Sequence, residues 1–190
     1  MSPSHSVPER SLVRDAPVER TMSTARVVAD VPLHRARARR HDLLVGATVA
    51  GVLAGGAAMA WVAASAALAG LPSWRPLAVV AVTLLGEEAA NGGAGPVLGG
   101  LLLWTGVSTA LALGYAAIVP RDFSFASSAL VGVAYSFVVM ALMTTTVLPR
   151  VNALMRAEMA EIGGAWVIAY AVYGLGLGLV PRLRRRWLAM

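Results

Sequence analysis

The chain has 190 residues, of which 57% are hydrophobic, and a formal net charge of +6. This length suits one domain, but so high an apolar fraction exceeds that of a soluble globule and indicates a membrane protein. The sequence has no cysteine, which excludes disulfides, thiolate metal sites and a cysteine nucleophile. Its arginines are spread over tails and loops, so we expect no nucleic-acid-binding face.

The N-terminal region is polar and basic. Residues 1–33 contain scattered Pro, Ser and Arg without a sustained period, which is typical of disorder. No apolar run long enough for a signal peptide occurs before Leu43, and Arg35, Arg37, Arg39 and Arg40 lie directly ahead of that residue. We therefore predict that residues 1–41 form a disordered basic tail in the cytoplasm and that residues 42–190 form one membrane domain.

The first apolar block, residues 43–70, is long enough to cross a bilayer with some tilt. Ala47, Gly51 and Gly55 recur every four residues and share one helix face. Lipid tails are as apolar as leucine, so helices in a bilayer associate through close backbone approach at small side chains. We expect these three residues to pack against another helix.

A shorter apolar segment, residues 77–85, follows the first block and is too short to cross. It is interpreted as an interfacial, re-entrant or short buried helix between spans one and two. Glu87 and Glu88 close it. If the helix dips into the bilayer, these carboxylates are candidates for a proton or cation contact. The simpler interpretation, which we prefer, is that both are solvated in an outer loop.

The second and third crossings are predicted at residues 97–119 and 125–148, joined by a turn so short that they must be antiparallel neighbours. Pro149 is expected to end the third crossing, and residues 151–162 to form an amphipathic helix on the outer surface. Each crossing has small residues at spacing four, which we expect to mediate helix packing: Gly106, Ala110 and Gly114 in the second, and Ser128, Gly132 and Ser136 in the third.

The last crossing, residues 163–181, contains no charged residue and is followed at once by Arg182, Arg184, Arg185 and Arg186. Tyr170, Gly174 and Gly178 lie on one face of it. The glycines are expected to pack against a helix, and Val180 to face lipid. The Tyr170 hydroxyl needs a partner if it is buried, for which we expect a structural hydrogen bond rather than a substrate contact.

Two features agree on the topology. Four crossings put both termini on one side of the membrane, and arginine clusters flank the first and the last crossing. Because basic residues stay on the cytoplasmic side, both termini are predicted to be cytoplasmic. The predicted fold is all-α, a four-helix transmembrane bundle in the bacterial inner membrane.

Four motifs carry a resemblance to a known family: SWRP at residues 73–76, VPRD at 119–122, LPRVNALM at 148–155 and AWVIAYAVYGLGLGL at 165–179. With them, residues 73–181 resemble a family of uncharacterised bacterial four-helix integral membrane proteins. The resemblance implies one compact bundle with a short apolar helix between spans one and two, and no established activity. Members often have a histidine before the Tyr-Gly pair of the last span, where this chain reads Tyr170, Ala171 and Val172.

The sequence offers few groups for chemistry. His5, His34 and His41 lie in the tail or at its junction, so we expect neither a metal site nor a cofactor. No nucleophile is paired with a base, which argues against an enzyme. The favoured hypothesis is a structural or accessory bundle that interacts with the lipid bilayer and with another membrane protein or a second copy. The alternative is a small oligomeric transporter or channel for protons, cations or a small solute.

Overall fold

The computed structural model describes residues 18–186, and the side chains of residues 41–184. It divides the chain into two units, residues 1–39 and residues 40–190. The first helix, α1, runs from Val18 to Leu68 and thus includes residues 18–41 of the tail that we predicted to be disordered. Residues 18–31 contain neither Pro nor Gly, the two residues that disfavour a helix most. The part of the predicted tail at residues 1–17 lies outside the described residues.

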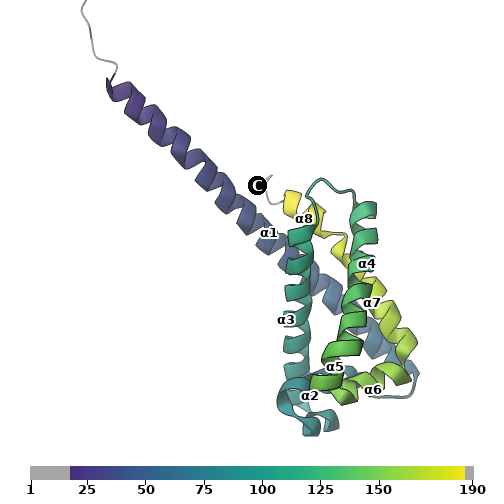
Figure 1. The fold of residues 1–190 in the computed structure, drawn as a ribbon. Helices are drawn as coiled ribbons and strands as arrows, with labels where there is room; N and C mark the ends of the chain where they lie inside the picture. The colour runs from purple at the N-terminus through teal and green to yellow at the C-terminus, as the bar shows by residue number, and fades with distance from the viewer. Residues whose placement is uncertain (1–17, 187–190) are drawn as a thin grey trace, which may run out of the picture. The chain divides into compact units, whose positions relative to one another are not determined.

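Every regular element of the described chain is a helix. After α1 come α2 (Arg75–Leu85), the 3₁₀ turn η1 (Glu87–Asn91), α3 (Ala94–Ile118), α4 (Phe125–Leu142), the π-helical turn η2 (Met143–Val147), α5 (Leu148–Val151), α6 (Ala153–Glu161), α7 (Gly163–Leu177) and α8 (Val180–Arg186). Figure 1 shows α3, α4 and α7 running along the bundle, with α2, α5 and α6 gathered at one end.

Four helical stretches are long and apolar enough to cross a membrane: His41–Leu68, Ala94–Ile118, Phe125–Val151 and Gly163–Arg184. Their order matches the four predicted crossings. The all-helical fold with four long apolar helices is therefore confirmed. The shorter apolar helix that we predicted between the first two is α2, whose residues Pro76 and Ala78–Val82 are buried.

We predicted that the third crossing ends at Pro149, but the third stretch continues past this residue to Val151. It continues through η2 into α5, and Pro149 lies in the first turn of α5. Proline has no N–H to donate to the preceding turn, and a π-helical turn before it changes which carbonyls need a partner. The hydroxyls of Thr144 and Thr145 donate to the carbonyls of Met140 and Ala141 in the last turn of α4, at 2.9 and 2.7 Å.

The amphipathic helix predicted at residues 151–162 is broken at Asn152, whose extended backbone separates α5 from α6. Met155, Glu158 and Met159 are the buried residues of α6. Val151 and Leu154, which we expected on the apolar face, are exposed. Because the break changes the direction of the chain between α5 and α6, residues 151–162 do not form one continuous helix with a single apolar face.

The third and fourth spans approach closely at their small residues. Gly132 of α4 faces Gly174 of α7, and a Cβ placed on Gly174 would lie 2.5 Å from the Cα of Val133. Further along, a Cβ on Gly178 would lie 2.9 Å from the Cβ of Ala129. Ser128 and Ser136 are fully buried on the same face of α4. Val180, expected toward lipid, is also fully buried.

The first span packs on α3 through its predicted face. Ala47 is fully buried, a Cβ on Gly51 would lie 2.8 Å from that of Ala112, and one on Gly55 would lie 2.5 Å from the Ser108 hydroxyl oxygen. The Ser108 and Ala112 side of α3 therefore forms this contact.

The predicted face of α3 lies elsewhere. Gly106 and Ala110 are exposed, and a Cβ on Gly106 would meet nothing within 4 Å. Gly114 is exposed as well, with the Tyr135 hydroxyl 3.3 Å from its Cβ position. Gly106 and Ala110 therefore do not lie at a helix contact among the described residues, whereas Gly114 lies against Tyr135 of α4. The helix carries small residues at spacing four on two faces, and spacing alone does not choose between them.

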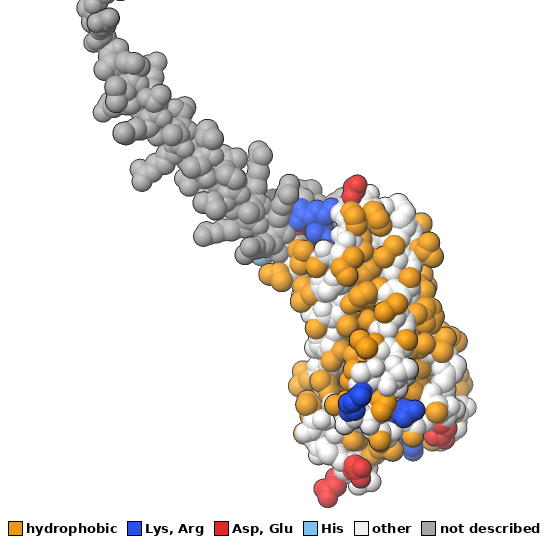
Figure 2. All heavy atoms as spheres, viewed as in Figure 1, with side chains coloured by type: hydrophobic (Ala, Val, Ile, Leu, Met, Phe, Trp, Pro, Cys, Tyr) orange, Lys and Arg blue, Asp and Glu red, His pale blue; other side chains and the backbone are white. Residues whose placement is uncertain are grey.

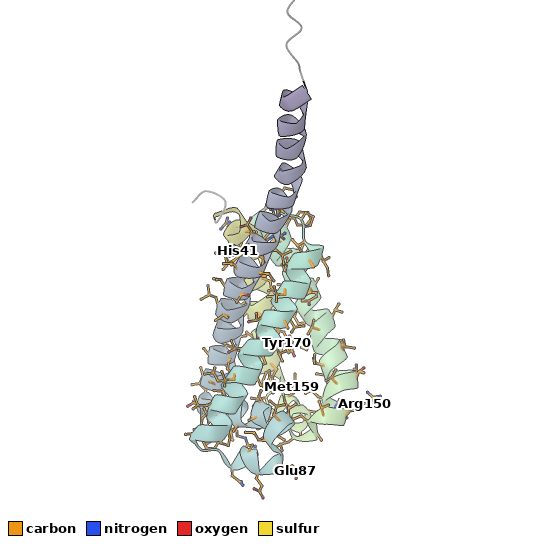
Figure 3. The ribbon with its side chains drawn as sticks, turned by 90° about the vertical axis from the view of Figure 1, so that its left-hand side faces the viewer. His41, Glu87, Arg150, Met159 and Tyr170 are labelled. Carbon is orange, nitrogen blue, oxygen red and sulfur yellow. The ribbon has the colours of Figure 1, made fainter. Side chains whose placement is uncertain are left out.

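Charged side chains gather at the two ends of the unit formed by residues 40–190. On the face drawn in Figure 2, they lie near these ends, and hydrophobic side chains cover much of the surface between them. Figure 3 labels His41 near one end and Glu87 at the other. We call these the His41 end and the Glu87 end. The His41 end also contains Arg121, Asp122, Arg182 and Arg184, and the Glu87 end contains Arg75, Glu88, Arg150, Arg156, Glu158 and Glu161.

Candidate functional site

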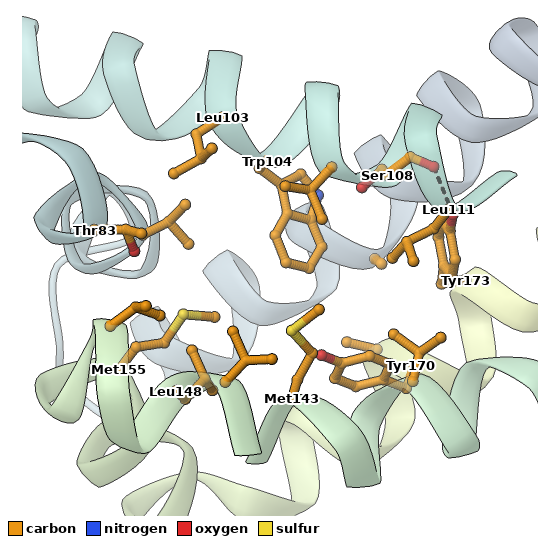
Figure 4. A pocket seen from close by; sticks show the side chains of 17 residues that line it. Thr83, Leu103, Trp104, Ser108, Leu111, Met143, Leu148, Met155, Tyr170 and Tyr173 are labelled. Atoms are coloured by element: carbon orange, nitrogen blue, oxygen red, sulfur yellow. Dashed lines mark hydrogen bonds between the residues drawn. The ribbon is translucent and has the colours of Figure 1, made fainter. Parts of the chain in front are cut away.

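A pocket of about 200 Å³ lies inside the bundle. One wall is α3, the opposite wall is the continuous stretch of α4, η2 and α5, and α7 closes a third side (Figure 4). Ala58 of α1 and Ala169 of α7 contribute small side chains to the lining. The pocket thus separates the second span from the C-terminal part of the third span, and it is the candidate functional site.

The π-helical turn supplies part of the lining. Met143 and Val147, the first and last residues of η2, reach the pocket together with Leu148 of α5. An extra residue in one turn rotates the side chains that follow it, and such turns are frequent at functional sites. The sequence signal that could have located this irregular turn is the run of threonines before Pro149, because threonine hydroxyls that bond carbonyls four residues earlier often bend a helix.

Most polar groups around the pocket are already engaged. The Tyr173 hydroxyl donates to the Ser108 carbonyl at 2.6 Å (Figure 4), and the Trp104 indole N–H donates to the Gly55 carbonyl at 2.8 Å. The Thr83 hydroxyl oxygen accepts from the Asn152 side-chain amide at 2.9 Å. These bonds tie α7, α1 and α6 to the pocket walls and leave the interior almost entirely apolar.

The side-chain hydroxyls of Ser108 and Tyr170 are the exceptions, because neither makes a hydrogen bond with any residue from 41 to 184. The structural bond that we predicted for Tyr170 is therefore not found within this range. Figure 4 shows its oxygen directed into the pocket beside Met143. Figure 3 shows Tyr170 between the His41 end and the Glu87 end of the bundle. The pocket therefore presents the Tyr170 hydroxyl, and the smaller hydroxyl of Ser108, to whatever occupies it.

Glu87 and Glu88 are not part of this pocket. Both are exposed in η1 at the Glu87 end, and neither contributes to the lining. The two carboxylates and Tyr170, which the sequence suggested as polar contacts, are thus not brought together.

Sequence reasoning missed a polar cluster at the Glu87 end that joins α2 to α6. The Arg75 guanidinium donates to a carboxylate oxygen of Glu158 at 2.9 Å, and Glu158 is only 2% exposed. This hydrogen bond, together with the charge of Glu158, raises the pKa of Arg75. The side-chain amide of Asn152 donates to the Val79 carbonyl at 2.8 Å, and its oxygen accepts from the N–H of Met155 at 2.8 Å. The motifs SWRP and LPRVNALM contain Arg75 and Asn152, but no spacing rule pairs residues so far apart.

At the His41 end, the Arg184 side chain caps the C-terminal end of α3. Its guanidinium donates to the carbonyls of Ala116 and Val119 at 2.9 and 3.3 Å. The last carbonyls of a helix lack intrahelical partners and carry partial negative charge, so a cation is favourable there. A Cβ on Gly46 would lie 2.9 Å from the Arg184 Cγ, so this arginine also packs on the first span.

The 17 residues that line the pocket include no Asp, Glu, His, Lys or Arg that could act as a base beside a nucleophile. Among the side chains of residues 41–184, no group of three or more His, Asp or Glu could hold a metal ion.

No family model, curated protein or solved structure matches the chain. The resemblance to a bacterial membrane-protein family, drawn above from four motifs, therefore stays a prediction.

Proposed function

We propose that the protein is a multi-pass protein of the bacterial inner membrane that acts as a structural or accessory bundle for other membrane components. The observation that carries this proposal is the position of the charged residues. In the four candidate spans, Asp, Glu and Arg occur only within the first or last few residues. Between the ends, large apolar side chains such as Leu102 and Leu130 are more than 70% exposed, which is unfavourable in water and suits lipid contact.

The orientation follows from charge. The His41 end is preceded in the sequence by four arginines at positions 35–40; Arg182 and Arg184 lie in the last residues of the fourth span, and Arg185 and Arg186 follow it. At the Glu87 end, three arginines are outnumbered by four glutamates. The positive-inside rule then places the His41 end and both termini in the cytoplasm. In this arrangement α2, with its buried alanines and valines, is a short helix held within the outer half of the bundle.

Transport, the alternative function, has less support. Ionisable residues within spans usually mark ion and proton pathways. Glu87 and Glu88 are exposed at the end of the bundle, and the pocket lining carries no ionisable group other than its tyrosines. The described residues thus offer no continuous path for a proton or cation through one copy of the chain.

Flux measurements separate the two functions. The purified protein is reconstituted into liposomes that contain a pH-sensitive dye, and proton and potassium flux are compared with protein-free liposomes and with Glu87→Gln and Glu88→Gln. The accessory function predicts equal flux in all four preparations. Flux through the wild-type protein that either variant reduces would establish transport and overturn the proposal. As a positive test, mass spectrometry of the protein isolated from its native membrane should identify one protein or lipid retained at constant stoichiometry.

A further inference from the structure

We propose that the pocket binds an uncharged lipophilic molecule bearing one oxygen that can accept a hydrogen bond, such as a ketone, ester or alcohol, and that Tyr170 donates that bond. This inference rests on the proposed insertion of the bundle in a bilayer. It goes beyond the accessory function because it assigns the protein a ligand class and a recognition residue.

The size and lining of the pocket fit a small lipophilic molecule. A cavity of roughly 150 Å³ lined by apolar side chains stays dry and binds benzene. At about 200 Å³, this pocket has room for a somewhat larger group. Leu103, Leu111 and Val139 form apolar walls, and Met143 and Met155 add flexible thioethers that adapt to different shapes. The enclosed part therefore takes a ring or a short stretch of hydrocarbon.

The Tyr170 hydroxyl selects the chemistry of the occupant. A hydroxyl in apolar surroundings is unfavourable without a hydrogen-bond partner, and this one has no partner among the described side chains or main chain. Water needs two to four polar partners to be held in such a place. The polar groups of Trp104, Tyr173 and Thr83 already make hydrogen bonds within the protein, which leaves the Ser108 hydroxyl as the other side-chain hydroxyl of the lining without a bond. A ligand oxygen inside the pocket gives the hydroxyl the partner that the bundle does not.

Two residues that line the pocket, Val107 on α3 and Val151 on α5, are 40% and 51% exposed. In the proposed orientation Val107 lies within the second span and faces the lipid, so a ligand dissolved in the bilayer can enter beside it without crossing water. An acyl chain of an ordinary phospholipid has no oxygen at the depth of Tyr170, which lies between the two charged ends. A lipophilic molecule with its oxygen within the hydrocarbon region fits better than a bulk lipid.

Photolabelling with two matched probes tests this inference on the full chain in lipid nanodiscs. The first probe is a ten-carbon 2-ketone with a diazirine at its far end, and the second is the same chain without the ketone. Mass spectrometry measures saturable labelling of the peptide that contains Val139–Val151, with unlabelled 2-decanone as competitor. We expect the ketone to label this peptide at lower concentration than the hydrocarbon.

The variants separate recognition from structure. Tyr170→Phe keeps the ring and removes the free hydroxyl, so the affinity of the ketone should fall about five- to tenfold, as expected for one neutral hydrogen bond. The hydrocarbon should be unaffected. Tyr135→Phe is the matched control, because the Tyr135 hydroxyl is already bonded to the Leu111 carbonyl and Tyr135 does not line the pocket. It should leave the affinity of both probes within twofold. Val107→Trp, at an exposed rim position, should reduce labelling by both.

Two results would overturn the inference. The first is equal labelling by both probes with no effect of Tyr170→Phe, which would mean that the pocket accepts any acyl chain. The second is the absence of saturable labelling of the pocket peptide by either probe. Both results are independent of the membrane topology, which is measured by chemical accessibility at the two ends of the bundle.

Discussion

Replacing Asn152 with alanine should destabilise the bundle by about 2–4 kcal/mol. This side chain is 3% exposed and makes three hydrogen bonds. The bond from the Met155 N–H to its oxygen caps α6, and loss of such a cap costs about 1 kcal/mol. The bonds from its amide to the Val79 carbonyl and the Thr83 hydroxyl each contribute about 0.5–1.5 kcal/mol, and their loss leaves these groups short of a donor.

Asn152→Ser divides this effect into its parts. A serine hydroxyl can still cap α6, but it cannot reach α2, so we expect about half the loss that alanine causes. Asn91→Ala, at an exposed asparagine, is the control and should change stability by less than about 0.5 kcal/mol. The free energy of unfolding is measured in mixed micelles by titration with a denaturing detergent, with helix content as the signal. A loss below 0.5 kcal/mol for alanine, or equal losses for serine and alanine, would refute the assigned bonds.

Three further outcomes are expected from the same unfolding assay. Arg75→Met should lower the free energy of unfolding by about 2–3 kcal/mol, less than for a fully buried pair because the Arg75 side chain is 37% exposed. Adding Glu158→Leu to Arg75→Met should recover most of this loss, and a double variant less stable than the single one would contradict the expectation. Gly174→Leu should lower the free energy of unfolding by about 3 kcal/mol or more, because a Cβ at this position meets the backbone of the neighbouring helix. Val167→Leu, at a 44% exposed site, is the control, and equal effects of the two substitutions would mean that the packing face is misassigned. Glu87→Gln should leave stability within about 0.5 kcal/mol, since its carboxylate is exposed, and a larger change would indicate a buried contact.

The long helices could be predicted because the bilayer imposes a simple rule. About 20 apolar residues are needed to cross, and stretches of that length stand out against polar loops in this sequence. The same rule recognised α2 as too short to cross. Exact ends were harder, as the continuation of the third span past Pro149 shows, because a π-helical turn before a proline depends on side-chain bonds from Thr144 and Thr145.

The contacts between helices were only partly predictable. The face of Gly51 and Gly55 lies against α3, and that of Gly132 against Gly174, as their spacing suggested. On α3 the same rule chose the exposed face of Gly106, although Ser108 lies on the face that meets α1. Spacing identifies which residues can permit close approach, whereas the position of the neighbouring helix decides which of them do.

The candidate site was the least predictable part. The sequence selected Tyr170 because a hydroxyl in an apolar span needs a partner, and this residue does line the pocket. The pocket itself is formed by side chains of seven helices and the turn η2, and no local pattern predicts such an assembly. The bond between Asn152 and Val79 likewise joins positions 73 residues apart, so it depends on the folded bundle.

Chemical accessibility at the two ends tests the central claim most directly. The native sequence has no cysteine, so single substitutions provide unique labels. Glu88→Cys, at the exposed Glu87 end, and Asp122→Cys, in the turn at the His41 end, are treated in intact spheroplasts with a maleimide that cannot cross the membrane. Our account predicts that Glu88→Cys is labelled at once and that Asp122→Cys is labelled only after lysis. Labelling of both in intact cells, or the reverse order, would contradict the four-crossing bundle with cytoplasmic termini.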